Sequence, residues 1–258
     1  MEVGVQRGVV LGPGEGESLF GGRIVLKATF PELCITESFF GSARDGASPH
    51  IHRHHADSFY VLEGGFAVLV HDEEHVLPPG GCVCAPPEVV HGFRTTSAAR
   101  FLNFHTPDGG FAENLRARNR GQAGGFDSID VEPGSGRAPT GAALLAAGEG
   151  ERLHGDNRVA TIKVGREELS LIEFELEPGF GGPDPHDHDD HIDSFYVLEG
   201  EPEFLMDGET VRLGAGSFVA APRGVVHAFA NPGPGRARLL NVHAPSTGFH
   251  DRLRDASD

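Results

Sequence analysis

Three histidines and one aspartate occur twice in the chain at the same spacing. In each set the first two histidines are two residues apart, and on a β-strand such residues point to the same side. Three imidazoles and one carboxylate suit a borderline divalent metal, namely Fe, Mn, Ni, Co, Cu or Zn. The pattern therefore predicts one metal site per copy. The candidate ligands are His50, His52, Asp57 and His91 in the first copy, and His186, His188, Asp193 and His227 in the second.

Two other interpretations of these residues stay open. An isolated histidine is usually a surface or core residue without a ligand role. Here, however, all four positions recur at an identical offset of 136 residues, which argues against an accidental cluster. The second alternative is that one copy binds metal while the other is vestigial.

The two sets belong to a repeat that spans most of the chain. Residues 57–64 and 193–200 both read DSFYVLEG, and the motif LNFH at 102–105 matches LNVH at 240–243. The segment 119–140 is rich in Gly, Pro, Ser and Asp and is interpreted as a connection. We therefore expect an N-terminal domain over residues 1–130 and a C-terminal domain over residues 131–258.

Strand signals dominate within each repeat. The chain of 258 residues contains 37 Gly and 18 Pro, and short apolar segments alternate with turn residues such as Asp207-Gly208. Helical patterns occur only at 110–120 and 248–256, where each closes a repeat. The sequence predicts an all-β protein of two tandem jelly-roll-type barrels, each ending in a short helix.

Composition narrows the classes of partner. The formal net charge of −17, without a basic patch, argues against nucleic acids and anionic membrane surfaces. No apolar run approaches the ~18 residues of a membrane-spanning helix, and the first residues lack a signal-peptide pattern. Three cysteines do not indicate a disulfide framework, and Cys82 and Cys84 are expected in the core. These features predict a cytoplasmic protein.

The ligand-type residues lie in recognisable motifs. Pro49-His50-x-His52-x4-Asp57-x6-Gly64 and Pro222-x-Gly224-x2-His227-x3-Asn231 resemble the two signature motifs of the cupin superfamily, and two copies resemble a bicupin. The resemblance implies one metal inside each barrel, held by the eight candidate ligands. Both copies carry Asp where the family usually has Glu. The first copy also has Glu88 in place of the motif glycine and Thr95 in place of the asparagine, so it is the copy expected to be degraded if either is.

The resemblance extends to metal bicupins of the quercetin 2,3-dioxygenase type. It implies an enzyme that uses O2 on an aromatic or enol-type small molecule, with Asp57 and Asp193 as both ligand and base. One alternative is a non-redox isomerase, lyase or decarboxylase acting on a small sugar or organic acid. Another is a non-catalytic module that binds a small molecule. The chain is expected to be a monomer or a homodimer.

Further polar residues surround the motifs. His105 and Asn103 share a strand face, as do His243 and Asn241, and each pair either supports the ligands or forms a structural hydrogen bond. Three other histidines crowd the first motif and are expected in a solvated loop. They are His54, His55 and His191.

Overall fold

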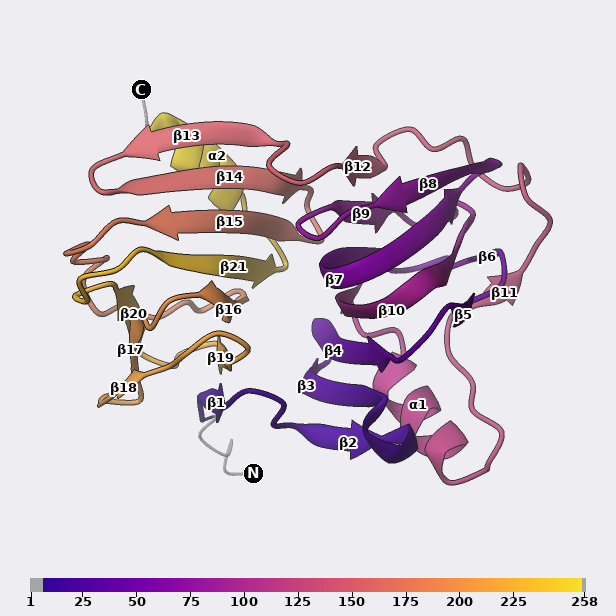
Figure 1. Ribbon diagram of the computed structural model, residues 1–258, viewed down its shortest axis with the longest axis horizontal. Helices are drawn as coiled ribbons and strands as arrows, with labels where there is room; N and C mark the ends of the chain where they lie inside the picture. The colour runs from indigo at the N-terminus through magenta and orange to yellow at the C-terminus, as the bar shows by residue number, and fades with distance from the viewer. Residues whose placement is uncertain (1–6, 257–258) are drawn as a thin grey trace. The chain divides into compact units, whose positions relative to one another are not determined.

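The computed structural model describes residues 7–256, which form two compact units. The N-terminal barrel comprises residues 16–149, and the C-terminal barrel comprises residues 150–256 together with 7–15. Figure 1 shows both as strand-rich units that each carry one short α-helix. Neither helix in the described part of the chain is long and apolar enough to cross a membrane.

The N-terminal barrel is built on one antiparallel sheet with the order β12-β9-β7-β10-β4-β3-β2, to which short strands add at the side. Its elements are β2 (Glu17–Leu19), β3 (Ile24–Phe30), β4 (Leu33–Phe40), β5 (Arg44–Asp45), β6 (His50–Ile51), β7 (Ala56–Val70), β8 (Glu73–Leu77), β9 (Cys82–Ala85), β10 (His91–Thr106), α1 (Phe111–Asn119), β11 (Ile129–Asp130) and β12 (Ala143–Leu145).

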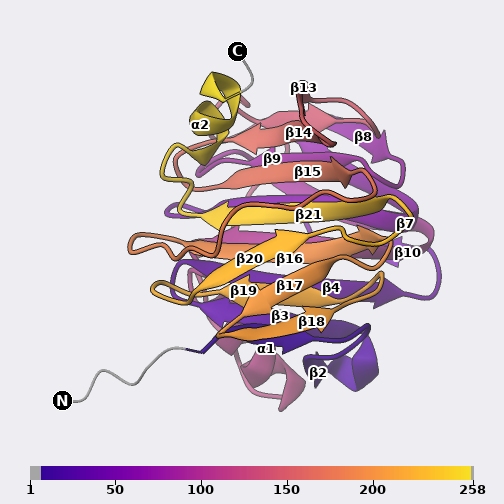
Figure 2. The same cartoon turned by 90° about the vertical axis from the view of Figure 1, so that its left-hand side faces the viewer.

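The C-terminal barrel repeats this arrangement in the order β1-β19-β16-β21-β15-β14-β13, with a second sheet β18-β17-β20. Figure 2 shows β13, β14, β15, β21 and β16 following one another in the larger sheet. Its elements are β1 (Val9–Leu11), β13 (Glu151–Gly155), β14 (Arg158–Gly165), β15 (Ser170–Leu176), β16 (Ile192–Glu199), β17 (Glu203–Met206), β18 (Glu209–Arg212), β19 (Phe218–Ala221), β20 (His227–Ala230), β21 (Ala237–Ala244) and α2 (Phe249–Asp255).

One edge strand of each large sheet comes from outside the repeat that builds the rest of the sheet. Strand β12 pairs with β9 in the N-terminal barrel, and β1 pairs with β19 in the C-terminal barrel. The compact units therefore differ from the ranges 1–130 and 131–258 that the repeat suggests. The physical reason is that each strand satisfies backbone groups at a sheet edge that would otherwise be left unpaired.

The glycine that ends the repeated DSFYVLEG motif has a steric role. Gly64 and Gly200 both adopt the left-handed conformation, with φ of +79° and +81°. A side chain at Gly64 would place its Cβ 1.8 Å from the carbonyl oxygen of Ala98, which is impossible. The glycine therefore allows β7 to pass close to β10 while both strands continue around the barrel.

Phenylalanines fill the core of the N-terminal barrel. Phe66 and Phe101 are almost fully buried, with their ring centroids 4.9 Å apart. Phe40, Phe59 and Phe93 each lie within 6.3 Å of at least one of these two rings. Cys82 and Cys84 are buried as expected. The aromatic cluster gives the barrel a rigid interior from which polar side chains can be positioned.

Each helix is attached to its barrel by the same ion pair. Arg116 of α1 donates to Glu17 of β2 with a shortest N–O distance of 2.6 Å, and Arg254 of α2 donates to Glu151 of β13 at 2.7 Å. Each arginine donates to its glutamate through both Nε and Nη2, which fixes the orientation of the pair as well as its distance. The helices expected at 110–120 and 248–256 are thus held at one end of each barrel.

Candidate metal centres

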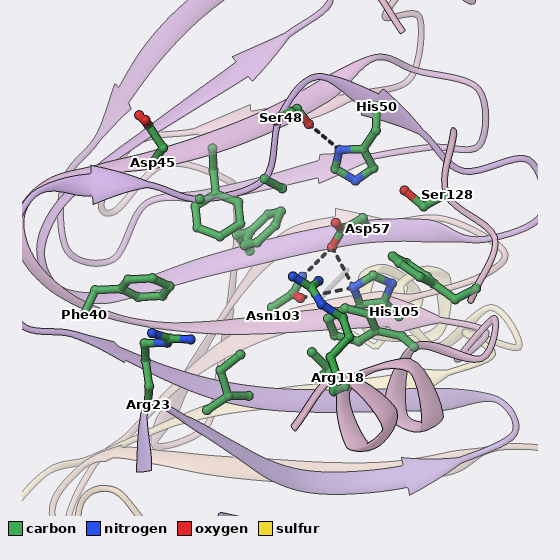
Figure 3. Close-up of a pocket in the computed structure, with 18 of the residues that line it drawn as sticks. Arg23, Phe40, Asp45, Ser48, His50, Asp57, Asn103, His105, Arg118 and Ser128 are labelled. Atoms are coloured by element: carbon green, nitrogen blue, oxygen red, sulfur yellow. Dashed lines mark hydrogen bonds and ion pairs between the residues drawn. The ribbon is translucent and has the colours of Figure 1, made fainter. Parts of the chain in front are cut away.

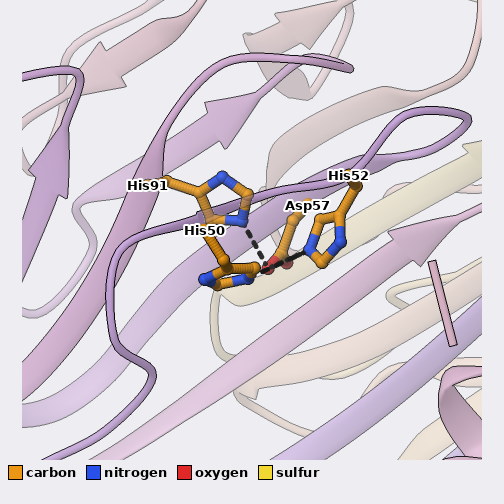
Figure 4. Close-up of side chains that lie close together, drawn as sticks. All are labelled: His50, His52, Asp57 and His91. Atoms are coloured by element: carbon orange, nitrogen blue, oxygen red, sulfur yellow. Dashed lines mark hydrogen bonds and ion pairs between the residues drawn. The ribbon is translucent and has the colours of Figure 1, made fainter. Parts of the chain in front are cut away.

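The four candidate ligands of the N-terminal barrel converge inside it (Figure 4). His91 at the start of β10 pairs with His50 of β6, while Asp57 enters from β7. His52 follows in the loop after β6. All four residues are buried, and each offers one donor atom within 4.8 Å of the others. The strand pairing thus brings together residues that are up to 41 positions apart in the sequence.

Backbone carbonyls fix the orientation of the three imidazoles. His50 Nδ1 donates to the Ser48 carbonyl at 2.8 Å, and His91 Nδ1 donates to the Val89 carbonyl at 2.9 Å. His52 Nδ1 donates to the carbonyl of Asp127. Because a carbonyl only accepts, each Nδ1 carries the proton and each Nε2 presents a lone pair.

The lone pairs of the cluster lie so close together that a cation among them would be strongly stabilising. The Nε2 atoms of His50 and His52 are 3.2 Å apart, with no proton between them in the neutral rings. Asp57 Oδ2 lies 3.2 Å from His91 Nε2 and 3.6 Å from His52 Nε2. Acceptors held this closely repel one another unless a positive ion lies among them. The residues present therefore fit a metal, and the short Asp side chain reaches the cluster.

The N-terminal cluster favours the protonation states that a metal requires. Burial raises the pKa of Asp57, but the facing imidazoles of His105, His52 and His91 lower it more, and the result is well below the usual value. Burial and the neighbouring histidines lower the pKa of His50 to about 4. At neutral pH the carboxylate is therefore ionised and His50 is neutral, so both can donate electron pairs to a metal.

The C-terminal barrel repeats this geometry. His186 Nδ1 donates to the Asp184 carbonyl at 2.8 Å, and His227 Nδ1 donates to the Val225 carbonyl at 3.0 Å. Asp193 Oδ2 lies 3.1 Å from His227 Nε2 and 3.9 Å from His188 Nε2. The second set of predicted ligands is thus also brought together.

Protonation differs in the C-terminal cluster. Burial raises the pKa of Asp193, but the nearby His243 and His227 lower it to about 2. Burial lowers the pKa of His227, yet contact with Asp193 raises it above the usual value. His227 therefore stays protonated to a higher pH than an unperturbed imidazole. A metal that binds in this barrel must displace that proton.

Family comparison agrees with these two clusters. The sequence model of the family described as "Cupin domain" matches residues 42–105 and 172–243, and each match contains one full set of candidate ligands. The chain is a bicupin of the cupin superfamily. The jelly-roll fold expected from the sequence is thereby confirmed for both barrels.

Relatives of the bicupin include enzymes of different activities. A quercetin 2,3-dioxygenase of Bacillus subtilis (strain 168) is 23% identical over 261 aligned residues, covering 85% of the bicupin and 77% of that protein. A solved salicylate 1,2-dioxygenase of Pseudoaminobacter salicylatoxidans superposes with a TM-score of 0.62 at 16% identity, covering 86% and 73% of the two chains. A solved oxalate decarboxylase of B. subtilis superposes with a TM-score of 0.56 at 16% identity, covering 83% of the bicupin and 68% of that chain. The structural matches establish the fold.

The first copy keeps its geometry despite the two departures from the motif. Glu88 adopts φ of +67° and donates its N–H to the His52 carbonyl at 2.7 Å. Gly224 of the second copy has φ of +75° and makes the same contact with His188 at 2.8 Å. The glutamate thus accepts a conformation that normally favours glycine. The N-terminal cluster of the bicupin is in fact the more enclosed one, since His186 and His188 are only half-buried.

Two histidines that were expected in a solvated loop are buried. His55 is 0% exposed and stacks on His52, and its Nε2 lies 2.9 Å from His105 Nδ1. His191 is 1% exposed and stacks on His188. The expectation was therefore wrong for both residues, because each ring packs behind a candidate ligand. It holds for His54, which is exposed.

Asparagine and histidine hold the buried carboxylate from behind. Asn103 donates its Nδ2 to Asp57 Oδ1, and His105 Nε2 lies 3.6 Å from the same oxygen. In the second copy Asn241 donates to Asp193 Oδ1 at 2.5 Å. Support of the ligand carboxylate was one of two alternatives that the sequence left open for these residues, and their contacts agree with it. Because the asparagines bind Oδ1, the other oxygen, Oδ2, faces the histidines.

Asp127 is a residue that sequence reasoning missed. It lies in the segment 119–140 that composition marks only as a connection. Its carbonyl accepts from His52, and its carboxylate accepts from the His54 N–H at 2.6 Å and lies 3.4 Å from His55 Nδ1. His188 has no equivalent tether among the described residues. No spacing signal marks Asp127 in the sequence, because it lies outside the repeated motifs.

We expect Asp127→Ala to weaken metal binding in the N-terminal barrel about tenfold, the size of effect typical of lost support behind a ligand. The carboxylate attaches the segment to residues 54 and 55, so its loss frees the carbonyl that orients His52. Competition against a chromophoric chelator measures this affinity. Glu132→Ala, an exposed change in the same segment, is the control. Equal weakening in both barrels would contradict the assignment.

A cavity opens beside each cluster. The N-terminal cavity has a volume of about 450 Å³ and reaches His50 and Asp57, as Figure 3 shows. The C-terminal cavity has a volume of about 400 Å³ and reaches His186 and Asp193. Phenylalanines form much of both walls. Cavities of this size accept small organic molecules.

Proposed function

We propose that the bicupin is a metal-dependent dioxygenase that acts on an aromatic or enol-type small molecule. The carrying observation is that three imidazole nitrogens and one carboxylate converge at the end of an aromatic-walled cavity in each barrel. The similarity to a quercetin 2,3-dioxygenase supports the same proposal. Under this proposal the eight candidate ligands hold one divalent metal per barrel.

The protein's own groups have distinct tasks in this proposal. A redox-capable metal held by the cluster would supply Lewis acidity and a path for electrons from the bound substrate to O2. Asp57 in the first barrel and Asp193 in the second accept the proton of the substrate's enol hydroxyl through Oδ2. Asn103 and Asn241 hold the opposite carboxylate oxygen, so that the base keeps its direction.

The cavity walls complete the site. Phe59 and Phe93 line the N-terminal cavity from the core, and Phe126 lines it from the segment after α1. In the C-terminal cavity Phe174, Phe195 and Phe229 lie at the core side. These rings pack against a flat substrate and keep water from the reacting atoms.

The proposal is tested by oxygen uptake. Protein loaded separately with Fe, Mn, Co, Ni, Cu or Zn is supplied with flavonols and other enols in an oxygen electrode. We expect O2 consumption in proportion to product with at least one redox-capable metal and none with Zn. Equal turnover without O2, or with Zn, would replace the dioxygenase with a non-redox isomerase, lyase or decarboxylase. Tight binding without turnover under any metal would favour a binding module.

A further inference from the structure

Three arginines line the N-terminal cavity and lack a carboxylate partner within the part of the chain that the structure describes. They are Arg23, Arg44 and Arg118. Other arginines of this barrel do form such pairs: Arg94 lies 2.6 Å from Glu74, and Arg100 lies 3.0 Å from Glu63. The guanidinium groups at the cavity therefore remain available to a ligand.

The fold holds each of these arginines in place. Arg118 is on α1, which the Arg116–Glu17 pair attaches to β2. Arg44 is on β5, where its N–H donates to Thr95 Oγ1 at 3.1 Å. Arg23 precedes β3, and its carbonyl accepts from the Phe39 N–H at 2.8 Å. Figure 3 shows Arg23 and Arg118 on the side of the cavity opposite Ser48 and His50.

The local charge is opposite to that of the whole chain. The formal net charge is −17, yet three guanidinium groups face one cavity. Two exposed carboxylates, Asp45 and Asp130, also line it, and Asp45 lies opposite Arg94 in the β5–β10 pairing. Asp57 is enclosed by its histidines. The outer part of the cavity therefore keeps a positive excess that favours an anion.

The C-terminal cavity provides an internal comparison, because one arginine lines it in place of three. That arginine, Arg158, lies one residue before Val159, which the strand register matches to Arg23. Phe180 takes the place of Arg44, since the bridge of Phe180 with Asn231 matches the pairing of Arg44 with Thr95. Ala256, directly after α2, matches Arg118 of α1 at the offset of 138 that relates Phe249 to Phe111. Thr95, which replaces the asparagine of the family motif, thus pairs with Arg44, whereas Asn231 of the second copy pairs with Phe180.

We propose that the N-terminal cavity selects an aromatic substrate that carries a carboxylate, and that the C-terminal cavity does not. This inference rests on the proposed function for the chemistry at the metal end, but the charge selection stands on the arginines. A guanidinium matches a carboxylate in shape and charge. The aromatic ring lies between the phenylalanine walls, and its hydroxyl points toward His50 and Asp57.

The test compares two probes of equal shape and different charge. Binding of 2-hydroxybenzoate and 2-hydroxybenzamide to the protein as purified is measured by titration calorimetry. We expect the benzoate to bind at least tenfold more tightly, with an affinity that falls as salt is raised. Arg118→Gln and Arg44→Gln should each weaken the benzoate about tenfold and leave the amide unchanged. Equal affinities, or no effect of either substitution, would overturn the proposal.

Matched controls locate the effect. Arg120→Gln changes an exposed arginine two residues further along that does not line the cavity and should have no effect. Arg158→Gln in the C-terminal cavity should also leave benzoate affinity unchanged, and a tenfold loss there would overturn the assignment. If the benzoate bound more tightly than the amide only because it chelates the metal, this difference in affinity would persist in Arg118→Gln. Oxygen uptake on neutral flavonols without any preference for carboxylates would sustain the proposed function and reject this inference.

Discussion

Replacement of His91 with alanine should remove the metal from the N-terminal barrel, with a loss of affinity greater than about 100-fold. The substitution deletes one of three nitrogen donors from a set that is buried and cannot recruit a substitute easily. His91 is 1% exposed, its Nδ1 is fixed to the Val89 carbonyl, and its ring centroid lies 4.3 Å from that of His50. Oxygen-dependent turnover in this barrel should disappear with the metal.

Metal content per chain, measured by elemental mass spectrometry after dialysis, checks this expectation. Wild-type protein with two equivalents should fall to one in His91→Ala and in His227→Ala, and to none in the double variant. His75→Ala changes a partly exposed histidine of the same barrel outside the cluster and should keep both equivalents. Full metal in His91→Ala would refute the assignment. A single equivalent in the wild type, lost only in His91→Ala, would leave the N-terminal barrel as the working site.

The convergence of the candidate ligands could be predicted from their spacing and from the repeat. The two-residue spacing predicts that His50 and His52 converge, and they do so although His52 lies in the loop after β6. The long-range partners His91 and Asp57 are identified by the repeat. The helices were visible from their position at the end of each repeat. Spacing that recurs in two copies carries information about contacts that a single copy would not.

Other features could not be predicted, since they depend on packing and on backbone contacts that no spacing in the sequence records. Asp127 lies in a stretch that composition marks only as a connection, yet its backbone orients His52. The burial of His55 depends on packing behind a ligand, which a run of polar residues conceals. Net charge was equally uninformative about the arginines of the N-terminal cavity, because a sum over the chain says nothing of where charges gather.

Replacement of Phe101 with alanine should lower the free energy of unfolding of the N-terminal barrel by about 3–5 kcal/mol, the usual cost of deleting a buried phenyl ring. Phe101 is 1% exposed, and its ring stacks on Phe40 at 5.5 Å with an interplanar angle of 13°. It also contacts Phe66 and Phe93 at centroid distances of 4.9 Å and 5.3 Å. The cavity left behind cannot close without moving several other rings.

Urea unfolding measures the change. Phe101→Leu, which keeps most of the volume, should cost less than half as much, and Val76→Ala at a site 67% exposed should cost almost nothing. A Phe101→Ala protein as stable as Val76→Ala would show that the cluster does not support the barrel. Two of the rings that Phe101 contacts, Phe40 and Phe93, also line the cavity beside the metal cluster. Their displacement should weaken aromatic ligands even below the unfolding midpoint, because the rings that stabilise the barrel are also the wall against which a substrate packs.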